Sequence, residues 1–161
     1  MNRVLDLLKE GSALTTEEMA NILHMDSSEV KDAIRSLQER EILLGWRPVF
    51  NPNRPESNQT AHAVIEVKIR PQVEGGYDRI ADRISRFPQV ESCYLMSGAY
   101  DLLVFMNAES LQAIAAFVFE RLAAIDGVVS TATHFMLRAY KEQGYRVDAG
   151  KLHSDKPIVS P

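Results

Sequence analysis

The 161-residue sequence predicts an α+β protein made of two different parts. Three observations indicate this division. Helical patterns fill residues 1–50, strand-like alternation of apolar and polar residues dominates residues 61–140, and the polar stretch NPNRPESNQT lies between them. We therefore predict a helical domain over 1–50, a linker over 51–60, a mixed domain over 61–140 and a C-terminal tail over 141–161.

The first part contains three predicted helices. Apolar residues at positions 4, 5, 7 and 8 form the first, which stops at Gly11. Thr15 and Glu18 have the spacing of a capping box at the start of the second, and Asp26 and Glu29 repeat that spacing at the start of the third. Two short helices joined by so tight a turn, behind a first helix, are typical of a helix-turn-helix. The extended segment ILLGWRPVF follows, and we expect it to form a small wing.

The second part has the order strand, helix, strand, strand, helix, strand. HAVIEVKIR alternates as a strand does, and YDRIADRISRF has helical spacing and stops at Pro88. VESCYLMS and YDLLVFMN are predicted strands separated by GA, and a long helix over 110–127 precedes a last strand, VVSTATHFMLRAY. This βαββαβ order is the ferredoxin-like arrangement, an α/β sandwich with both helices on one face of a four-stranded sheet.

The other face of that sheet is predicted to pack on a second copy of the chain. LLVFM at residues 102–106 is apolar at every position. Strands that are apolar on both sides are usually buried on both sides. We therefore expect a homo-oligomer, either a dimer or an assembly of dimers.

Composition limits the classes of function. The single cysteine, Cys93, excludes an internal disulfide and favours a reducing, cytoplasmic setting. No apolar stretch is long enough for a signal core or a membrane span, so no membrane partner is expected. The four histidines lie far apart without metal-ligand spacing, and we predict neither a metal nor a cofactor. Catalysis is not expected, because no nucleophile elbow, paired-carboxylate motif or phosphate loop is present.

The third helix is the candidate for nucleic-acid contact. Serines at its start can meet a phosphate with the help of the helix dipole, and a lysine and an arginine four residues apart share one face. Acidic residues on the same helix would repel phosphate, and the net charge of −4 lacks the usual basic footprint. From the residues alone, a DNA-reading face and an ordinary solvated face are about equally good interpretations of this helix. The candidate contacts are Ser27, Ser28, Lys31, Arg35 and Gln38.

The stretch SGAYD at residues 97–101 is the second candidate site. Turn chemistry alone explains Gly98, so a plain hairpin turn is the simpler interpretation of these residues. Asp101 is harder to explain, because it starts an apolar strand where an unpaired carboxylate is costly to bury. A ligand cation and an internal base such as Arg138 are the two partners that we consider for it.

The chain resembles the Lrp/AsnC family of prokaryotic transcriptional regulators to about Tyr140. The resemblance rests on SLQEREILLGW at the end of the helix-turn-helix, on the βαββαβ domain behind a hinge, and on SGAYDLLV, which is similar to the family's Gly-x-Tyr-Asp turn. It implies dimers formed through the sheet of a RAM-type domain, and small effectors, usually amino acids, bound between dimers near that turn. The chain departs from the family in lacking the usual early hinge glycine and in having a less basic recognition helix.

On this resemblance, the third helix reads double-stranded DNA and the SGAYD turn contributes to an amino-acid site. The chemistry suits an amino acid, because backbone N–H groups beside a glycine can hold a carboxylate, an aspartate can pair with an ammonium group, and a tyrosine supplies a flat wall. The alternative is an effector-binding oligomer whose acidic helix-turn-helix no longer reads DNA and binds a protein partner. The predicted effector residues are Ser97, Gly98, Ala99, Tyr100 and Asp101.

Overall fold

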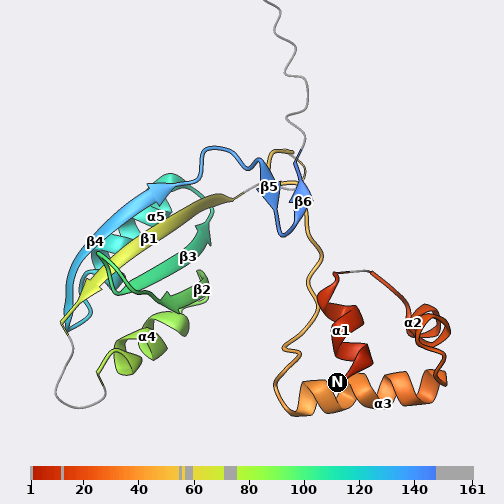
Figure 1. The fold of residues 1–161 in the computed structure, drawn as a ribbon. Helices are drawn as coiled ribbons and strands as arrows, with labels where there is room; N and C mark the ends of the chain where they lie inside the picture. The colour runs from red at the N-terminus through yellow and green to blue at the C-terminus, as the bar shows by residue number, and fades with distance from the viewer. Residues whose placement is uncertain (1, 12, 55, 57–59, 71–75, 148–161) are drawn as a thin grey trace, which may run out of the picture. The chain divides into compact units, whose positions relative to one another are not determined.

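The chain folds into a helical unit followed by a mixed unit. A computed structural model describes residues 2–11, 13–54, 56, 60–70 and 76–147. The chain separates into two compact units, Met1–Pro48 and Val49–Pro161. Figure 1 shows helices α1 to α3 in the first unit and the main sheet in the second. The α+β class predicted from the sequence is therefore observed.

The first unit contains three helices, and their starts follow the predicted caps. The Thr15 hydroxyl accepts a hydrogen bond from the Glu18 N–H at 3.2 Å, and the Thr15 N–H donates to Glu18 Oε2 at 2.7 Å. The Asp26 N–H donates to Glu29 Oε2 at 2.9 Å in the same way. These reciprocal bonds satisfy backbone groups that a helix start leaves open. The helices are α1 (Arg3–Lys9), α2 (Thr16–Leu23) and α3 (Ser27–Glu39).

A small apolar core holds the three helices together. Val30 of α3 is fully buried and packs in one cluster with Val4 of α1 and with Met19 and Leu23 of α2. Leu37, two turns further along α3, is also buried. The buried positions of α3 thus recur at helical spacing, which leaves its opposite face to solvent.

The expected wing does not form a β-hairpin. Residues 40–50 are all described, and none of them is in a strand. Ile42 and Leu43 fold back on the end of α3 by donating to the Leu37 carbonyl at 2.9 and 3.1 Å. Beyond them, Gly45 and Pro48 interrupt the segment, and a proline has no N–H for a strand ladder. The predicted extended segment is present, but it lacks the second strand that a hairpin needs.

The start of the predicted linker is anchored to the mixed unit. Asn53 pairs with the backbone of Ala139 through both ends of its side-chain amide: Nδ2 donates to the Ala139 carbonyl at 2.8 Å, and Oδ1 accepts from the Ala139 N–H at 3.2 Å. Asn51 also closes a short turn, because its Oδ1 accepts from the Asn53 N–H at 3.0 Å. Residues 55 and 57–59 of the predicted linker lie outside the described residues.

The mixed unit has the predicted βαββαβ order. Its sheet has the strand order β2-β3-β1-β4, and β1 pairs antiparallel with both β3 and β4, as β2 does with β3. Sequence neighbours β2 and β3 are adjacent, whereas β1 and β4 meet across the whole unit. The elements are β1 (Ala61–Ile69), α4 (Asp78–Ser85), β2 (Val90–Leu95), β3 (Leu102–Ala108), α5 (Leu111–Phe117), the π-helical turn η1 (Val118–Leu122) and β4 (Val128–Phe135).

One face of this sheet carries the larger core. Alternate residues of β1 and β3 are buried, as the period of two along a strand requires. They cluster with apolar residues from α4, α5 and η1, so these helices all cover the same face of the sheet. The fully buried members of this cluster are Ile65, Val67, Leu102, Val104, Met106, Ile84, Ile114 and Leu122.

Three boundaries differ from the sequence prediction. The predicted long helix turns π-helical at Val118, and its apolar residues Leu111 and Ala115 are exposed. The last strand ends at Phe135 rather than at residue 140. The predicted tail begins with a hairpin, β5 (Lys141–Glu142) and β6 (Tyr145–Arg146), whose two turn residues, Gln143 and Gly144, both have positive φ (+43° and +93°). Residues 148–161 of that tail lie outside the described residues.

The opposite face of the sheet mixes apolar and charged side chains. Leu103 and Phe105 of β3 alternate with the core residues and are only half-buried. The Tyr94 ring meets the Phe105 ring edge-on with centroids 6.1 Å apart. Glu66 of β1 and His134 of β4 are diagonal neighbours across the strand pair, with Oε1 and Nε2 3.3 Å apart. Packing of this face on a second copy stays a prediction, and its apolar residues are the reason for it.

Candidate functional site

The exposed face of α3 carries four of the five predicted DNA contacts. Ser28, Lys31, Arg35 and Gln38 are all exposed. Ser27 is different, because its Oγ is buried and has no hydrogen-bond partner among the described residues. It is the first residue of α3 and is half-buried, whereas Ser28 beside it is exposed. The Ser27 hydroxyl therefore does not face outward as expected, and a contact of Ser27 with DNA stays a prediction.

Two of the acidic residues on α3 are already engaged. Glu29 accepts the Asp26 N–H in the capping box described above. Asp32 accepts a hydrogen bond from Arg35, with Oδ1 and Nη1 3.0 Å apart, and the two side chains are 70% and 67% exposed. Because an ion pair this exposed contributes about 0–1 kcal/mol, the Arg35 guanidinium can exchange Asp32 for another anion at little cost.

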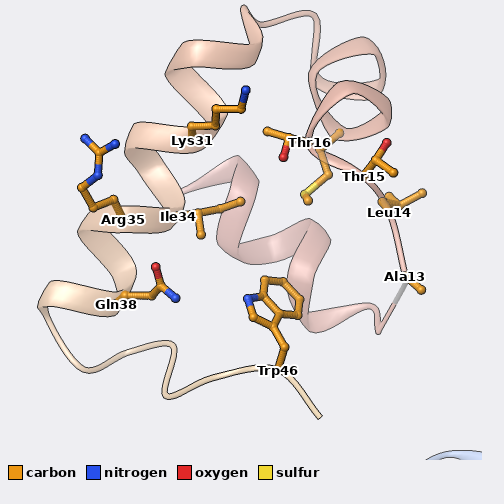
Figure 2. Close-up of a pocket in the computed structure, with 10 residues that line it drawn as sticks. Ala13, Leu14, Thr15, Thr16, Lys31, Ile34, Arg35, Gln38 and Trp46 are labelled. Carbon is orange, nitrogen blue, oxygen red and sulfur yellow. The ribbon is translucent and has the colours of Figure 1, made fainter. Parts of the chain in front are cut away.

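A hollow lies beside this face, between α2 and α3 (Figure 2). Its volume is about 640 Å³. Figure 2 shows Lys31, Arg35 and Gln38 along α3 on one side, Thr15 and Thr16 on the other, and the Trp46 indole at one end. This arrangement was not predicted from the sequence, although Trp46, the one tryptophan of the chain, follows α3 in the extended segment. The lining residues are Ala13, Leu14, Thr15, Thr16, Met19, Lys31, Ile34, Arg35, Gln38 and Trp46.

At the α2 side of the hollow, the capping box fixes the position and the charge of the Glu18 carboxylate. Hydrogen bonds from the Thr15 N–H and then from the Thr15 hydroxyl lower the pKa of Glu18 below its ordinary value of 4.5. The carboxylate is thus ionised at neutral pH and bound to the helix start, where a negative charge is favoured by the helix dipole.

The SGAYD loop is longer than the two-residue turn predicted for it. β2 ends at Leu95 and β3 begins at Leu102, so six residues, 96–101, connect them. The Met96 N–H donates to the Asp101 carbonyl at 2.8 Å and closes the loop. Gly98 has φ +131°, a backbone conformation that L side chains rarely adopt, and a Cβ built on it would meet open space. The backbone angle is therefore sufficient reason for a glycine at this position.

Asp101 has an internal partner that the sequence analysis did not consider. Its Oδ2 accepts a hydrogen bond from the Ile69 N–H at 2.8 Å, and its own N–H donates to the Val67 carbonyl at 3.0 Å. β1 extends past the start of β3 here, so the carboxylate replaces a missing ladder carbonyl beside the irregularity at Lys68 and Ile69. The suggested internal partner, Arg138, instead lies over the Tyr140 ring at 5.5 Å.

The other residues of this loop are accessible. Ser97, Gly98 and Ala99 are exposed, and Tyr100 is half-buried. The loop therefore combines an anchored end at Asp101 with an exposed apex around Gly98. An accessible glycine backbone beside a tyrosine can contact a small molecule without any change to the strands.

Other kinds of site have no support in the described part of the chain. Residues 2–147, apart from the gaps given above, contain no group of three histidine, cysteine or acidic side chains that could hold a metal ion. No helix in the same residues is long and apolar enough to cross a membrane.

Residues 62–145 match the family model described as the Lrp/AsnC ligand-binding domain. The HTH-type transcriptional regulator YugG of Bacillus subtilis is 36% identical over 156 residues, which are 97% of this chain and 93% of that protein. The HTH-type transcriptional regulator FL11 of Pyrococcus furiosus is 24% identical over 87% of this chain and 89% of its own length. These relatives are transcriptional regulators and not enzymes.

Solved structures share the fold at low sequence identity. A transcriptional regulator from Neisseria meningitidis, solved in complex with L-Met, has a TM-score of 0.64 and 23% identity and covers 91% of this chain and 94% of its own. AsnC of E. coli has a TM-score of 0.64 at 15% identity and covers 88% and 93%. The arrangement of helices and strands described above is therefore one that these structures also adopt.

Proposed function

The chain belongs to the Lrp/AsnC family of transcriptional regulators, and we propose that it binds double-stranded DNA through α3 and responds to an amino acid bound by its sheet unit. The observation that carries the DNA proposal is the placement of Lys31, Arg35 and Gln38 on one exposed face of α3. A helix has the width to enter the major groove, where a lysine or arginine can contact phosphate or a guanine edge. The cytoplasm is the setting that such a function requires.

The effector proposal rests on the family model and on the exposed loop. The matched region, residues 62–145, is described as a ligand-binding domain, and it contains the whole SGAYD loop. The L-Met complex of the Neisseria meningitidis regulator supports an amino acid as the class of ligand. In this proposal the exposed backbone around Gly98 and the Tyr100 side chain contact the ligand, while Asp101 holds the loop on β1. We place the site at an interface of a homo-oligomer.

A mobility-shift assay tests the DNA proposal. The probe is the DNA upstream of the protein's own gene, with a random-sequence duplex of equal length for comparison. We expect the double variant Lys31→Ala and Arg35→Ala to lose binding to the native probe, because each side chain supplies a cation to the same face. The matched control is Lys9→Ala with Arg86→Ala, which removes two positive charges outside α3.

The control variant separates a site from a general charge effect. If the control loses as much affinity as the α3 variant, net charge and not the helix face governs binding. If the wild-type protein retains neither duplex, the DNA proposal fails and the alternative, a protein partner for the acidic helical unit, becomes the better hypothesis. A thermal-shift screen of amino acids, beginning with L-methionine, tests the effector proposal, because a ligand that binds only the folded state raises the melting temperature.

A further inference from the structure

The hollow beside α3 combines an apolar floor with a polar rim. Leu14, Met19 and Ile34 contribute apolar side chains from the turn before α2, from α2 and from α3. The ammonium group of Lys31 and the hydroxyl groups at the start of α2 lie beside it, whereas the guanidinium group of Arg35, another lining residue, points away from it (Figure 2). A site of this composition suits a ligand with an anionic group joined to a compact, weakly polar body.

Trp46 is the feature of this hollow that packing does not explain. Its indole is 61% exposed, although tryptophan is a side chain whose burial is strongly favourable. It closes one end of the hollow in Figure 2, with the indole nitrogen turned towards the α3 side. An indole offers a flat apolar face for contact and an N–H that can donate to an anion. An exposed indole in the same hollow as Lys31 is therefore placed to contact a ligand that carries an anionic group.

The start of α2 adds favourable dipoles to the same hollow. The first N–H groups of a helix have no partner within the helix, and they attract anions. Glu18 opposes this, but its carboxylate is bonded to the Thr15 N–H and hydroxyl. The capping box therefore directs that negative charge to the helix start.

We propose that this hollow receives one sugar-phosphate unit of a DNA strand, with the phosphate between Lys31 and the start of α2 and the deoxyribose against the indole of Trp46. This inference rests on the proposed function and adds to it a contact that carries no base sequence. Phosphate contacts set the register of a recognition helix, whereas base contacts set its specificity. Trp46 is thus a positioning residue: it fixes how α3 lies on the duplex.

The chain has one tryptophan, so its fluorescence reports on this hollow directly. The full-length protein is titrated with the upstream duplex, with the random-sequence duplex and with thymidine 5′-monophosphate. We expect both duplexes to change the Trp46 emission at the concentrations at which they bind. The monophosphate, which has the same chemistry without the strand, is expected to act only at much higher concentration. A change at equally low monophosphate concentration would assign the hollow to a free nucleotide and overturn the inference.

Two substitutions separate the contact from a structural role. Trp46→Ala is expected to weaken binding to both duplexes about tenfold and by the same factor, with an unchanged salt slope, because the indole carries no charge. Lys31→Gln is expected to reduce that slope by about one unit. Leu44→Ala is the matched control, since Leu44 is 89% exposed in the same segment and does not line the hollow.

The outcomes distinguish this inference from the proposed function. If the wild-type protein binds DNA but Trp46 emission stays constant and Trp46→Ala binds as Leu44→Ala does, the inference is wrong and DNA binding by α3 stands. If the wild-type protein binds neither duplex, both fail together. If Trp46→Ala loses its cooperative thermal transition, the indole has a structural role. Trp46→Phe is then used in its place, provided that it unfolds like the wild-type protein, and its DNA affinity alone decides whether the side chain contacts DNA.

Discussion

Replacing Asp101 decides between a ligand contact and a structural contact in the SGAYD loop. The carboxylate accepts the Ile69 N–H at 2.8 Å at a partly buried position. Asp101→Ala removes that acceptor and leaves a backbone donor of β1 without its partner. A half-buried donor that loses its acceptor costs about 1–3 kcal/mol, and solvent access at this position favours the lower half of that range. We therefore expect the free energy of unfolding of the ligand-free protein to fall by about 1–2 kcal/mol.

Asp101→Asn is the more informative partner of this substitution. Asparagine keeps an oxygen that can accept the Ile69 N–H and loses only the negative charge. Its cost should be smaller, about 0.5–1 kcal/mol, since hydrogen bonds to charged groups are about twice as strong as neutral ones. Ser97→Ala is the control, because Ser97 is exposed in the same loop and should leave stability unchanged. Urea denaturation, followed by circular dichroism, measures all three variants.

Calorimetry on the same variants completes the test. If Asp101 only anchors the loop, an amino acid that binds the wild-type protein should bind Asp101→Asn with nearly the same affinity once the variant is folded. The reasoning is refuted if Asp101→Ala unfolds like the wild-type protein while Asp101→Asn binds the amino acid at least tenfold more weakly. That result would assign the carboxylate to a ligand ammonium group.

Three further predictions concern other parts of the chain. Asn53→Ala should lose about 1–2 kcal/mol, because it removes both partly buried hydrogen bonds with Ala139, and limited trypsin digestion after Arg54 should become faster than in the wild-type protein. Glu18→Gln should make the helical unit less sensitive to acid. Because folding lowers the pKa of Glu18, its contribution to stability is present above pH 4.5 and is lost as the pH falls through the lower pKa of the folded state. Thermal melts from pH 6 to pH 3 measure this loss. Phe105→Asp should lower the mass measured by light scattering at micromolar concentration from at least a dimer towards 18.1 kDa, and a wild-type protein already at 18.1 kDa would contradict the predicted oligomer.

The elements that sequence alone predicted are those with a local cause. A capping box needs only residues three apart, and both boxes are present at Thr15 and Asp26. The alternation of β1 is equally local and yields the buried face of Ala63 to Ile69. The order of elements then restricts the sheet to few topologies, and the observed order is the ferredoxin-like one.

The features that sequence reasoning missed depend on residues far apart in the chain. Asn53 meets Ala139 across 86 positions, so nothing near NPNRP predicts that the linker start is anchored. The hairpin at residues 141–146 is the exception, because its two-residue turn at Gln143 and Gly144 is a local feature that was overlooked. Asp101 was judged as a carboxylate in need of a cation, whereas a backbone N–H of a neighbouring strand satisfies it. This hydrogen bond cannot be predicted until the strand ends are known, because the Ile69 N–H is left without a ladder partner only where β1 extends past β3.

The acidic balance of the chain is weaker evidence against DNA binding than the charge count suggests. On and around α3, Glu18 and Glu29 are held at helix starts, and Asp32 is held by Arg35. What a phosphate meets is therefore a face with Lys31 and an exchangeable Arg35, with Glu39 as the remaining exposed acid at the end of the helix. One such face supplies only about two phosphate contacts, which is too few for tight binding at physiological salt. A dimer doubles the contacts and fixes the spacing of two recognition helices, so that DNA affinity should depend on the same apolar sheet face that we expect to hold two copies together. If Phe105→Asp yields a folded monomer, its affinity for the upstream duplex should fall although no residue of α3 has changed, and unaltered affinity in that monomer would show that one helix face is enough.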